Sequence, residues 1–123
     1  MKSKKSKESK EQEYLIKWCN IAKCKYPHLD RIHSIPNGAW VRNKWEAVKL
    51  KREGLKTGVP DLFLPVPRHG YHGLYIELKH GKNKAQPNQK EWIAFLNSMG
   101  YKAVVAWEFE GAKEVIENYY NGK

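Results

Sequence analysis

The sequence is poor in cysteine, in aspartate and in long apolar stretches. Its two cysteines, Cys19 and Cys24, fall in one predicted helix at a spacing that does not align them on one face, so we expect neither a disulfide framework nor a zinc knuckle. No apolar run approaches the roughly 20 residues that span a bilayer, and Met1 is followed by lysines and serines instead of an apolar signal segment. We therefore expect a cytoplasmic protein with reduced thiols and no membrane association.

The shortage of acidic residues leaves a strongly basic chain. Among its 123 residues, 23 lysines and arginines stand against 13 aspartates and glutamates, for a net charge of +10. Residues 1–10 hold five lysines and one glutamate, so the remaining 18 basic and 12 acidic residues still give +6. This charge favours a polyanionic partner, and nucleic acid suits it better than a membrane because no amphipathic anchor pattern accompanies it. The alternative is a basic protein with no such partner.

The spacing of apolar residues predicts a single mixed α/β domain over residues 8–123. A disordered basic tail at residues 1–7 is expected to precede it. A helix is expected over residues 8–25, and a short strand leads into the turn "IPNG". A second helix follows, and then a hairpin whose strands contain "DLFLPV" and "GLYIELK". Pro87 opens a third helix, "KAVVAW" forms a last strand, and a fourth helix ends the chain.

Several of these elements carry apolar patterns that predict buried faces. The second helix combines a stripe of Val41, Trp45 and Val48 with a strongly basic opposite face. The run "KAVVAW" at residues 102–107 is nearly all apolar, as expected of a strand covered on both faces. The stripes of the last two helices are Trp92, Phe95, Leu96 and Met99, and Ala112, Val115, Ile116 and Tyr119.

The stretch "LYIELKHG" at residues 74–81 places two charged residues on one face of an apolar strand. Glu77 and Lys79 are two positions apart, so strand alternation points both side chains the same way. One interpretation is an exposed ion pair, which is common and contributes little. The other is a catalytic pair, for which Asp61 supplies a third charged group across the hairpin, directly after "GVP".

Asp61 and Glu77 would form a carboxylate pair suited to Mg²⁺ or Mn²⁺, hard cations that prefer oxygen ligands and retain several waters. Lys79 would lie beside the attacking water, which it would orient or deprotonate while its charge offsets that of a phosphate. The metal would lower the pKa of this water and stabilise the transition state. The combination suits the hydrolysis of a phosphodiester.

Three segments, "GVPDLFLPV", "GLYIELK" and "QPNQKEWIAFL", resemble in order the VRR-NUC (virus-type replication-repair nuclease) family of the PD-(D/E)XK nuclease superfamily. The resemblance spans about residues 8–117. It implies an α/β, restriction-endonuclease-like core in which helices flank a mixed central β-sheet, and a stand-alone nuclease domain like those encoded by phages. The sequence departs from the family's commonest pattern in having "QPNQ" where a serine often caps the helix.

This resemblance implies a role for each matching residue. Asp61 and Glu77 would be metal ligands, and the main-chain carbonyl of Leu78 would complete the metal shell. Lys79 would be the catalytic lysine. Gln89, early in the third helix, would hydrogen-bond near the phosphate or the water.

The family also places a glutamate of the first helix near the metal. Glu8, Glu11 and Glu13 compete for this position. Glu8 lies one turn before Gln12, which resembles the family's spacing best, and Glu11 is the second choice. Asn37, in "IPNG", is either a turn residue or a further polar residue that faces the site.

Basic residues flank the expected site on both sides. They are expected to contact phosphates, which favours recognition of DNA shape over DNA sequence. They are Arg42, Lys44, Lys49, Lys51, Arg52 and Lys56 before the site, and Lys82, Lys84 and Lys90 after it. His69, His72 and His80 fit no standard zinc spacing, so we expect them to contact DNA or solvent.

Stand-alone members of this family resemble Holliday-junction resolvases, so the expected function is that of a metal-dependent, structure-selective DNA endonuclease. A chain with one site cuts one strand at a time, and paired incisions in a four-way junction therefore require a homodimer. Two alternatives remain. One is a nuclease for flaps or other branched or single-stranded DNA, and the other is a DNA-binding module without catalysis.

Overall fold

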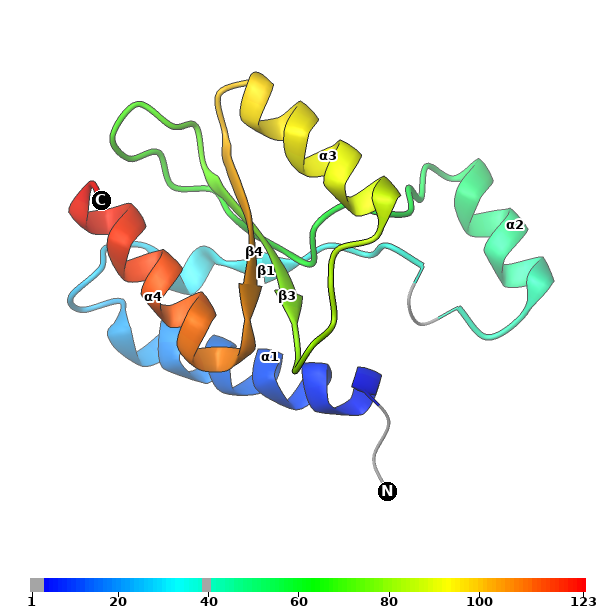
Figure 1. Ribbon diagram of the computed structural model, residues 1–123, viewed down its shortest axis with the longest axis horizontal. Helices are drawn as coiled ribbons and strands as arrows, with labels where there is room; N and C mark the ends of the chain where they lie inside the picture. Colours follow the sequence, from blue (N-terminus) through cyan, green and yellow to red (C-terminus); the bar gives the residue numbers. More distant parts are fainter. Residues whose placement is uncertain (1–3, 39–40) are drawn as a thin grey trace.

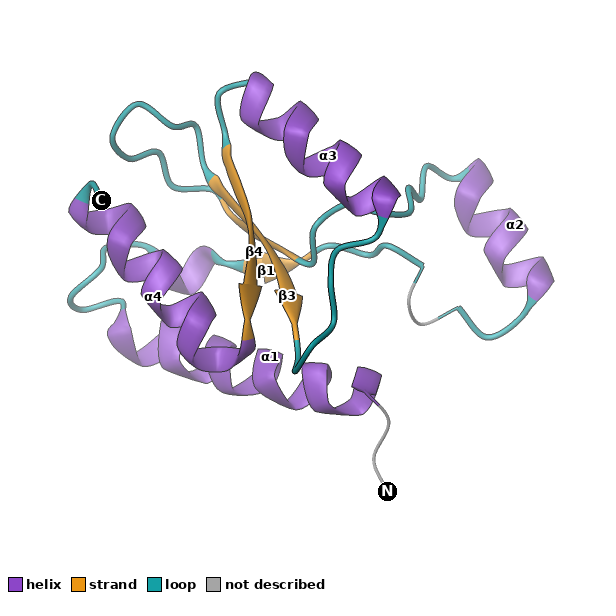
Figure 2. Cartoon of the chain, viewed as in Figure 1, coloured by secondary structure: helices purple, strands orange, loops and turns teal. Residues whose placement is uncertain are grey.

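The computed structural model describes residues 4–38 and 41–123, in which helices surround a four-stranded sheet (Figures 1 and 2). The elements in chain order are α1 (Lys4–Ala22), the 3₁₀ turn η1 (Leu29–Arg31), β1 (His33–Ser34), α2 (Lys44–Arg52), β2 (Leu62–Leu64), β3 (Leu74–Lys79), α3 (Pro87–Ser98), β4 (Lys102–Trp107) and α4 (Glu108–Asn121). The predicted order of helices and strands is confirmed. Helix α1 starts four residues before the expected position, so it includes residues 4–7 that the sequence assigned to a disordered tail; residues 1–3 lie outside the described part.

The sheet has the strand order β1-β2-β3-β4. Strand β2 pairs antiparallel with β1 and with β3, whereas β4 pairs parallel with β3. The sheet is therefore mixed, and the predicted hairpin is β2–β3. Strand β4 is an edge strand, and both its faces are covered as predicted: α3 and α4 each contact it, and Ala103 and Ala106, which point to opposite faces, are both buried. Only Trp107, at its end, is exposed.

One face of the sheet carries the hydrophobic core, which α1 and α4 cover (Figure 1). Alternate residues of β2 and β3 point into this core, and they pack against Leu15 and Cys19 of α1. The predicted stripe of α4 is confirmed, since Ala112, Ile116 and Tyr119 are buried there. The core residues contributed by β2 and β3 are Leu62, Leu64, Leu74, Ile76 and Leu78.

The opposite face of the sheet is aromatic at one end. Phe63 and Tyr75 face each other across the hairpin and stack with ring centroids 4.3 Å apart, and Tyr101 packs edge-on against both. The odd-numbered residues of β3 point to this side, so Glu77 and Lys79 lie on the same face as Tyr75. The face that carries the aromatic cluster therefore also carries the expected site.

Helix α3 is held beside β4 by the buried side chain of Leu96 and by the side-chain amide of Asn97. Leu96 is buried, and the side chain of Asn97 bonds the backbone N–H and C=O of Ala103 at 3.0 Å each. Phe95 and Met99 are about half exposed, so the predicted burial of the whole stripe was wrong. The reason is that α3 packs on a sheet edge, which is too narrow to cover a full helix face.

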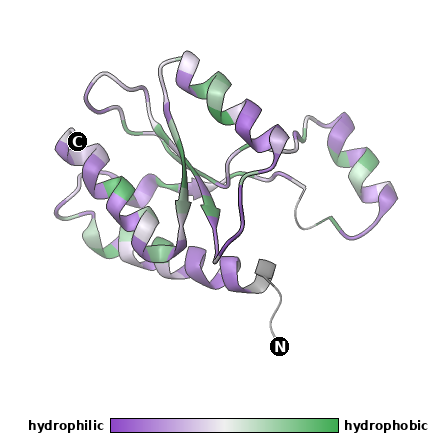
Figure 3. Ribbon diagram, viewed as in Figure 1, coloured by the Kyte–Doolittle hydropathy of each residue, from purple (hydrophilic) through white to green (hydrophobic). Residues whose placement is uncertain are grey.

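Helix α2 stands away from the sheet and buries no residue (Figure 1). The prediction of a buried face was therefore wrong: Trp45 is 86% exposed and Val48 51%. Figure 3 shows that this helix carries both hydrophilic and hydrophobic residues. The helix starts at a local cap instead, in which the Asn43 side chain accepts the N–H of Glu46 at 2.9 Å.

Both cysteines are free thiols, as predicted, with Cys19 buried and Cys24 exposed. Burial raises the pKa of the Cys19 thiol to about 12, so this group stays protonated at neutral pH. Within the described residues, no helix is long and apolar enough to cross a membrane.

Candidate active site

The hairpin brings Asp61 and Glu77 together. Leu62 pairs with Ile76 in the β2–β3 ladder, and continuing this antiparallel register by one pair sets Asp61 opposite Glu77. Lys79 lies two residues further along β3, on the same face as Glu77. Two carboxylates and an ammonium group therefore lie close together at the end of the hairpin formed by the start of β2 and the end of β3.

Asp61 is fixed by three hydrogen bonds. The Leu78 N–H donates to Asp61 Oδ2 at 2.8 Å, and Asn37 Nδ2 donates to Asp61 Oδ1 at 3.2 Å. The Asp61 carbonyl accepts the N–H of Ile35 at 2.8 Å, which ties the residue to the segment after β1. Of the two interpretations of Asn37, the structure supports the one in which it faces the site.

Glu77 and Lys79 are buried, with only 2% and 8% of their surface exposed. Lys79 Nζ lies 3.4 Å from Glu77 Oε2. This burial excludes the interpretation of an exposed ion pair on a sheet. Burying two charges costs free energy that the attraction between them offsets only in part, so such a pair is typical of sites that need it for function.

Gln89 completes this group from the first turn of α3. Its Nε2 donates to Glu77 Oε2 at 3.1 Å, while its Oε1 accepts the N–H of Gln86 at 2.8 Å. Gln86 is the N-cap of α3, as expected from its position before Pro87. The same hydrogen bond that starts the helix thus aims the Gln89 amide at the carboxylate of Glu77.

The turn before Asp61 packs directly on the start of α3. Gly58 has φ +90°, and a Cβ atom at this position would lie 2.9 Å from the carbonyl oxygen of Asn88. Only glycine fits this close approach without displacing the neighbouring backbone. The "GVPD" turn and the Gln89 helix are therefore positioned against each other.

The carboxylates of this cluster hold their protons more tightly than usual. Burial raises the pKa of Asp61 and the charge of Glu8 adds to this, while the Leu78 N–H, Asn37 and Lys79 lower it. Burial and the nearby Asp61 together raise the pKa of Glu77 to about 8, although Lys79 opposes this. Two close carboxylates that resist ionisation indicate a missing positive charge, which a cation would provide.

The donor set fits a hard divalent cation. Glu77 Oε1 is buried and has no hydrogen-bond partner among the described residues. Buried polar atoms without partners are rare in folded proteins, and here the free atom lies beside a second carboxylate. Oxygen ligands of this kind suit Mg²⁺ or Mn²⁺. The Leu78 carbonyl stays a predicted ligand, on the strand segment whose N–H binds Asp61.

The structure separates the two glutamates that competed on α1. Glu8 accepts a hydrogen bond from Asn83 Nδ2 at 2.8 Å and is near enough to Asp61 to raise its pKa. Glu11 instead accepts the N–H of Phe109 at 2.8 Å and so belongs to the start of α4. The proximity of Glu8 to Asp61 therefore favours Glu8 over Glu11 as the glutamate of α1 that lies near the expected metal site.

Asn83 was not found from the sequence. Besides its bond to Glu8, its carbonyl oxygen accepts the indole N–H of Trp107 at 2.8 Å. The loop after β3 is thereby held between α1 and the end of β4. No local pattern predicts these contacts, since their partners lie 75 and 24 residues away.

The residues expected to bind DNA are all exposed, and this set consists of Arg42, Lys44, Lys49, Lys51, Arg52, Lys56, Lys82, Lys84 and Lys90. Arg42 lies 3.7 Å from Glu46, a weak surface pairing. The three histidines have different surroundings. His69 Nε2 lies 2.9 Å from the Tyr120 carbonyl, His72 packs against Tyr101, and His80 follows β3.

A mixed sheet flanked by helices, with an aspartate and a Glu-x-Lys pair facing each other across its hairpin, defines a restriction-endonuclease-like core of the PD-(D/E)XK class. The family model of the VRR-NUC domain matches residues 3–107. A solved structure named "VRR_NUC domain protein" is 39% identical to the chain, with a TM-score of 0.80, and the match covers 94% of this chain and 88% of that one. No curated protein matches significantly. The chain thus belongs to the VRR-NUC family of nuclease domains.

Proposed function

We propose that this protein is a divalent-metal-dependent DNA endonuclease that hydrolyses phosphodiester bonds at the cluster of Asp61, Glu77 and Lys79. One observation carries the proposal. A buried glutamate has an unpartnered oxygen beside a second carboxylate and a lysine. A purely structural cluster would gain from pairing every buried polar atom, whereas a metal site needs an open one.

The residues of the site divide the chemistry between them. Asp61 and Glu77 would hold Mg²⁺ or Mn²⁺, with the Leu78 carbonyl and Glu8 as further ligands. When bound, the cation lowers the pKa of water and stabilises the charge that develops on the phosphate. Lys79, held beside Glu77, orients or deprotonates the attacking water and offsets the phosphate charge. Gln89 fixes the orientation of the Glu77 carboxylate, from a position near the phosphate.

DNA contact falls to the exposed basic residues that flank the site. Five of them lie on or beside α2: Arg42, Lys44, Lys49, Lys51 and Arg52. Because α2 stands away from the sheet, it and the rest of the domain can contact different parts of a bent or branched duplex. Trp45 offers an exposed indole on the same helix, and an aromatic ring of this kind can stack on an unpaired base. Phosphate contact together with base stacking supports selection by DNA structure.

We further propose a homodimer that cuts four-way junctions. The outer face of α3 exposes Phe95 and Met99, and beside it lies an open hollow of about 450 Å³ lined by Trp92, Phe95, Asn88, Glu91 and Thr57. Apolar surface of this kind on a strongly charged protein marks an interaction site, and a second copy of the chain is the partner that paired incisions require. The free thiols support a location in the cytosol. If the protein is encoded by a phage, this is the cytosol of its bacterial host.

The alternatives differ in what they require of the site. A flap or single-strand nuclease needs the same metal cluster but no second copy. A DNA-binding module needs no buried carboxylates, which would repel phosphate in the absence of a metal. The buried pair therefore favours a nuclease.

The test is a cleavage assay on labelled four-way junction, flap, nicked and linear DNA with Mg²⁺, Mn²⁺ or EDTA. We expect paired nicks in the junction with either metal and none with EDTA. Cleavage of flaps alone would replace the junction resolvase with the flap nuclease. Binding without cleavage of any substrate in either metal would overturn the proposed nuclease.

A further inference from the structure

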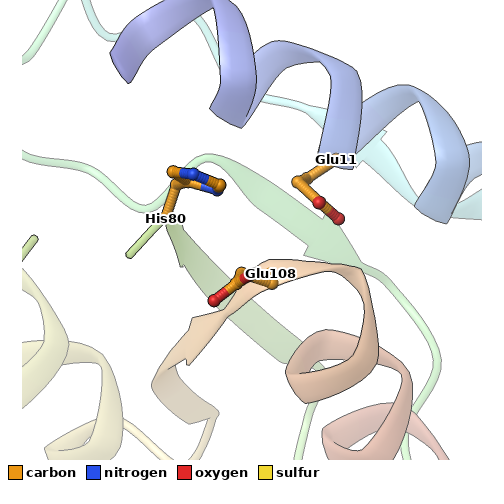
Figure 4. Close-up of side chains that lie close together, drawn as sticks. All are labelled: Glu11, His80 and Glu108. Carbon is orange, nitrogen blue, oxygen red and sulfur yellow. The ribbon is translucent and has the colours of Figure 1, made fainter. Parts of the chain in front are cut away.

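A second group of ligand-bearing side chains lies apart from the proposed active site. Glu11 of α1, His80 just after β3 and Glu108 at the start of α4 place one ligand atom each within 4.8 Å of one another (Figure 4). These residues come from three elements that are distant in sequence. The cluster shares no residue with the group of Asp61, Glu77 and Lys79.

Two of the three side chains are poised for a ligand. The Phe109 N–H fixes Glu11 Oε2 at 2.8 Å, which leaves the other carboxylate oxygen available. His80 Nδ1 is buried and has no hydrogen-bond partner within the described part of the chain. An unpartnered buried imidazole nitrogen is rare, because the neutral ring offers either a donor or a lone pair that burial leaves unsatisfied.

The charges of the cluster also lack a counterpart. Neither Glu11 nor Glu108 forms an ion pair with a lysine or arginine among the described residues, although the chain carries 23 of them. Two carboxylates this close repel each other unless a positive charge lies between them. The cluster therefore combines like charges with an unpaired nitrogen.

We propose that Glu11, His80 and Glu108 bind a divalent transition metal ion, Zn²⁺ in particular, at a site separate from the active site. One imidazole and two carboxylates match the ligands that zinc takes in proteins, and the nitrogen ligand disfavours Mg²⁺ and Ca²⁺. Three protein ligands leave room for water. This inference does not depend on the proposed nuclease activity.

The bound ion ties the ends of three elements to one another. It links α1 and the start of α4 to the residue that follows Lys79, and Glu11 lies one helical turn after Glu8. Because the unfolded chain cannot assemble this set of ligands, binding stabilises the folded state. The bound ion should therefore stabilise the end of the sheet at which the proposed active site lies.

The experiment uses the full chain with Asp61→Asn and Glu77→Gln, which removes the carboxylates of the proposed active site. After treatment with EDTA and dialysis, the protein is titrated with Zn²⁺ by calorimetry, and its thermal unfolding is followed. We expect one ion per chain and a rise in Tm of about 5 to 10 °C at saturating Zn²⁺. Co²⁺ in place of Zn²⁺ should shift the ring resonances of His80 in NMR spectra.

Single variants in this background identify the ligands. His80→Ala and Glu108→Gln should each weaken Zn²⁺ binding at least about tenfold and remove the rise in Tm. His33→Ala and Glu114→Gln, which change an exposed histidine and an exposed glutamate elsewhere, should leave both unchanged. No zinc binding by the background protein, or full binding after His80→Ala or Glu108→Gln, would overturn the proposal. Glu108 is exposed, so its variant is expected to stay folded.

Discussion

At the scale of single residues, the burial of Glu77 carries a large electrostatic cost. The residue is 2% exposed, one of its carboxylate oxygens has no hydrogen-bond partner among the described residues, and Asp61 lies beside it. Lys79 and Gln89 offset this cost only in part, since the pKa of Glu77 stays raised to about 8. A cation at the site would offset the remainder.

The pH dependence of stability tests this cost in the metal-free protein. The folded pKa of Glu77, about 8, lies above its ordinary value of 4.5. The folded state thus keeps a proton that the unfolded state loses, so stability falls as pH rises from about 4.5 to 8. We expect Glu77→Gln to stabilise the metal-free protein at pH 9, by a few kcal/mol at most, and to have little effect at pH 4. Urea unfolding with EDTA measures this.

The matched control is Glu114→Gln on the exposed side of α4, which should change neither stability nor its pH dependence. Mg²⁺ should stabilise the wild type at pH 8 and leave Glu77→Gln unaffected. Equal stability of wild type and Glu77→Gln at pH 9 in EDTA would show that burial of Glu77 is not costly.

At the scale of elements, the site depends on the contact between the turn before β2 and the first turn of α3. Gly58→Ala should push a Cβ atom against the Asn88 carbonyl, destabilise the fold by about 1 to 3 kcal/mol and displace Gln89 from Glu77. Cleavage should fall with it. Thermal unfolding and the cleavage assay measure the two effects.

Gly54 provides the control for this substitution. It also has a positive φ, +109°, but a Cβ atom there would meet nothing within 4 Å. Gly54→Ala should therefore cost only the backbone strain and leave cleavage intact. Equal losses of activity in both variants would contradict a role for the contact with α3.

Helix α2 should bind phosphates independently of the active site. Its basic residues are exposed and the helix buries nothing, so Lys49→Gln/Lys51→Gln should leave stability unchanged. The same double variant should weaken DNA binding and lower the slope of log K against log salt by about 2. Lys17→Gln/Lys23→Gln, on the α1 side, is the control. An unchanged salt slope in the α2 variant would remove this helix from the DNA interface.

Most elements were predictable from local pattern, and the errors share one cause. Alternation and turn residues predict the β2–β3 hairpin, and Pro87 predicts the start of α3. The predictions of buried side chains were wrong where burial depends on another element packing against the helix. Trp45 and Val48 form a stripe at helical spacing, but within the described part of the chain no residue of α2 is buried. Periodicity shows that a helix has an apolar face without showing what covers it.

The site was predictable to a similar extent. Glu77 and Lys79 are two apart on a strand and Asp61 opens its hairpin partner, so strand geometry alone brings them together. The choice between Glu8 and Glu11 was not local, because it depends on contacts to Asn83 and Phe109 far along the chain. The functional roles of these residues stay predictions.

At the scale of the whole molecule, the junction resolvase requires two copies. Phe95→Asp should disrupt a dimer that forms through the exposed face of α3 without unfolding the chain, since Phe95 is 52% exposed. Sedimentation should give a dimer for the wild type and a monomer for the variant, which should nick junctions on one strand at a time. Lys90→Asp, also exposed on α3, is the control for added negative charge. A monomeric wild type, with and without junction DNA, would contradict the dimer.

The central claim is that Lys79 acts on the chemistry of phosphodiester hydrolysis at a metal-dependent site. The most direct test compares Lys79→Ala with Lys102→Ala, which changes a lysine at the other end of the same sheet. With Mg²⁺ and junction DNA, Lys79→Ala should lower the cleavage rate at least about a hundredfold and change the Kd for DNA by less than about threefold. Lys102→Ala should cleave like the wild type. Wild-type cleavage by Lys79→Ala would contradict the account.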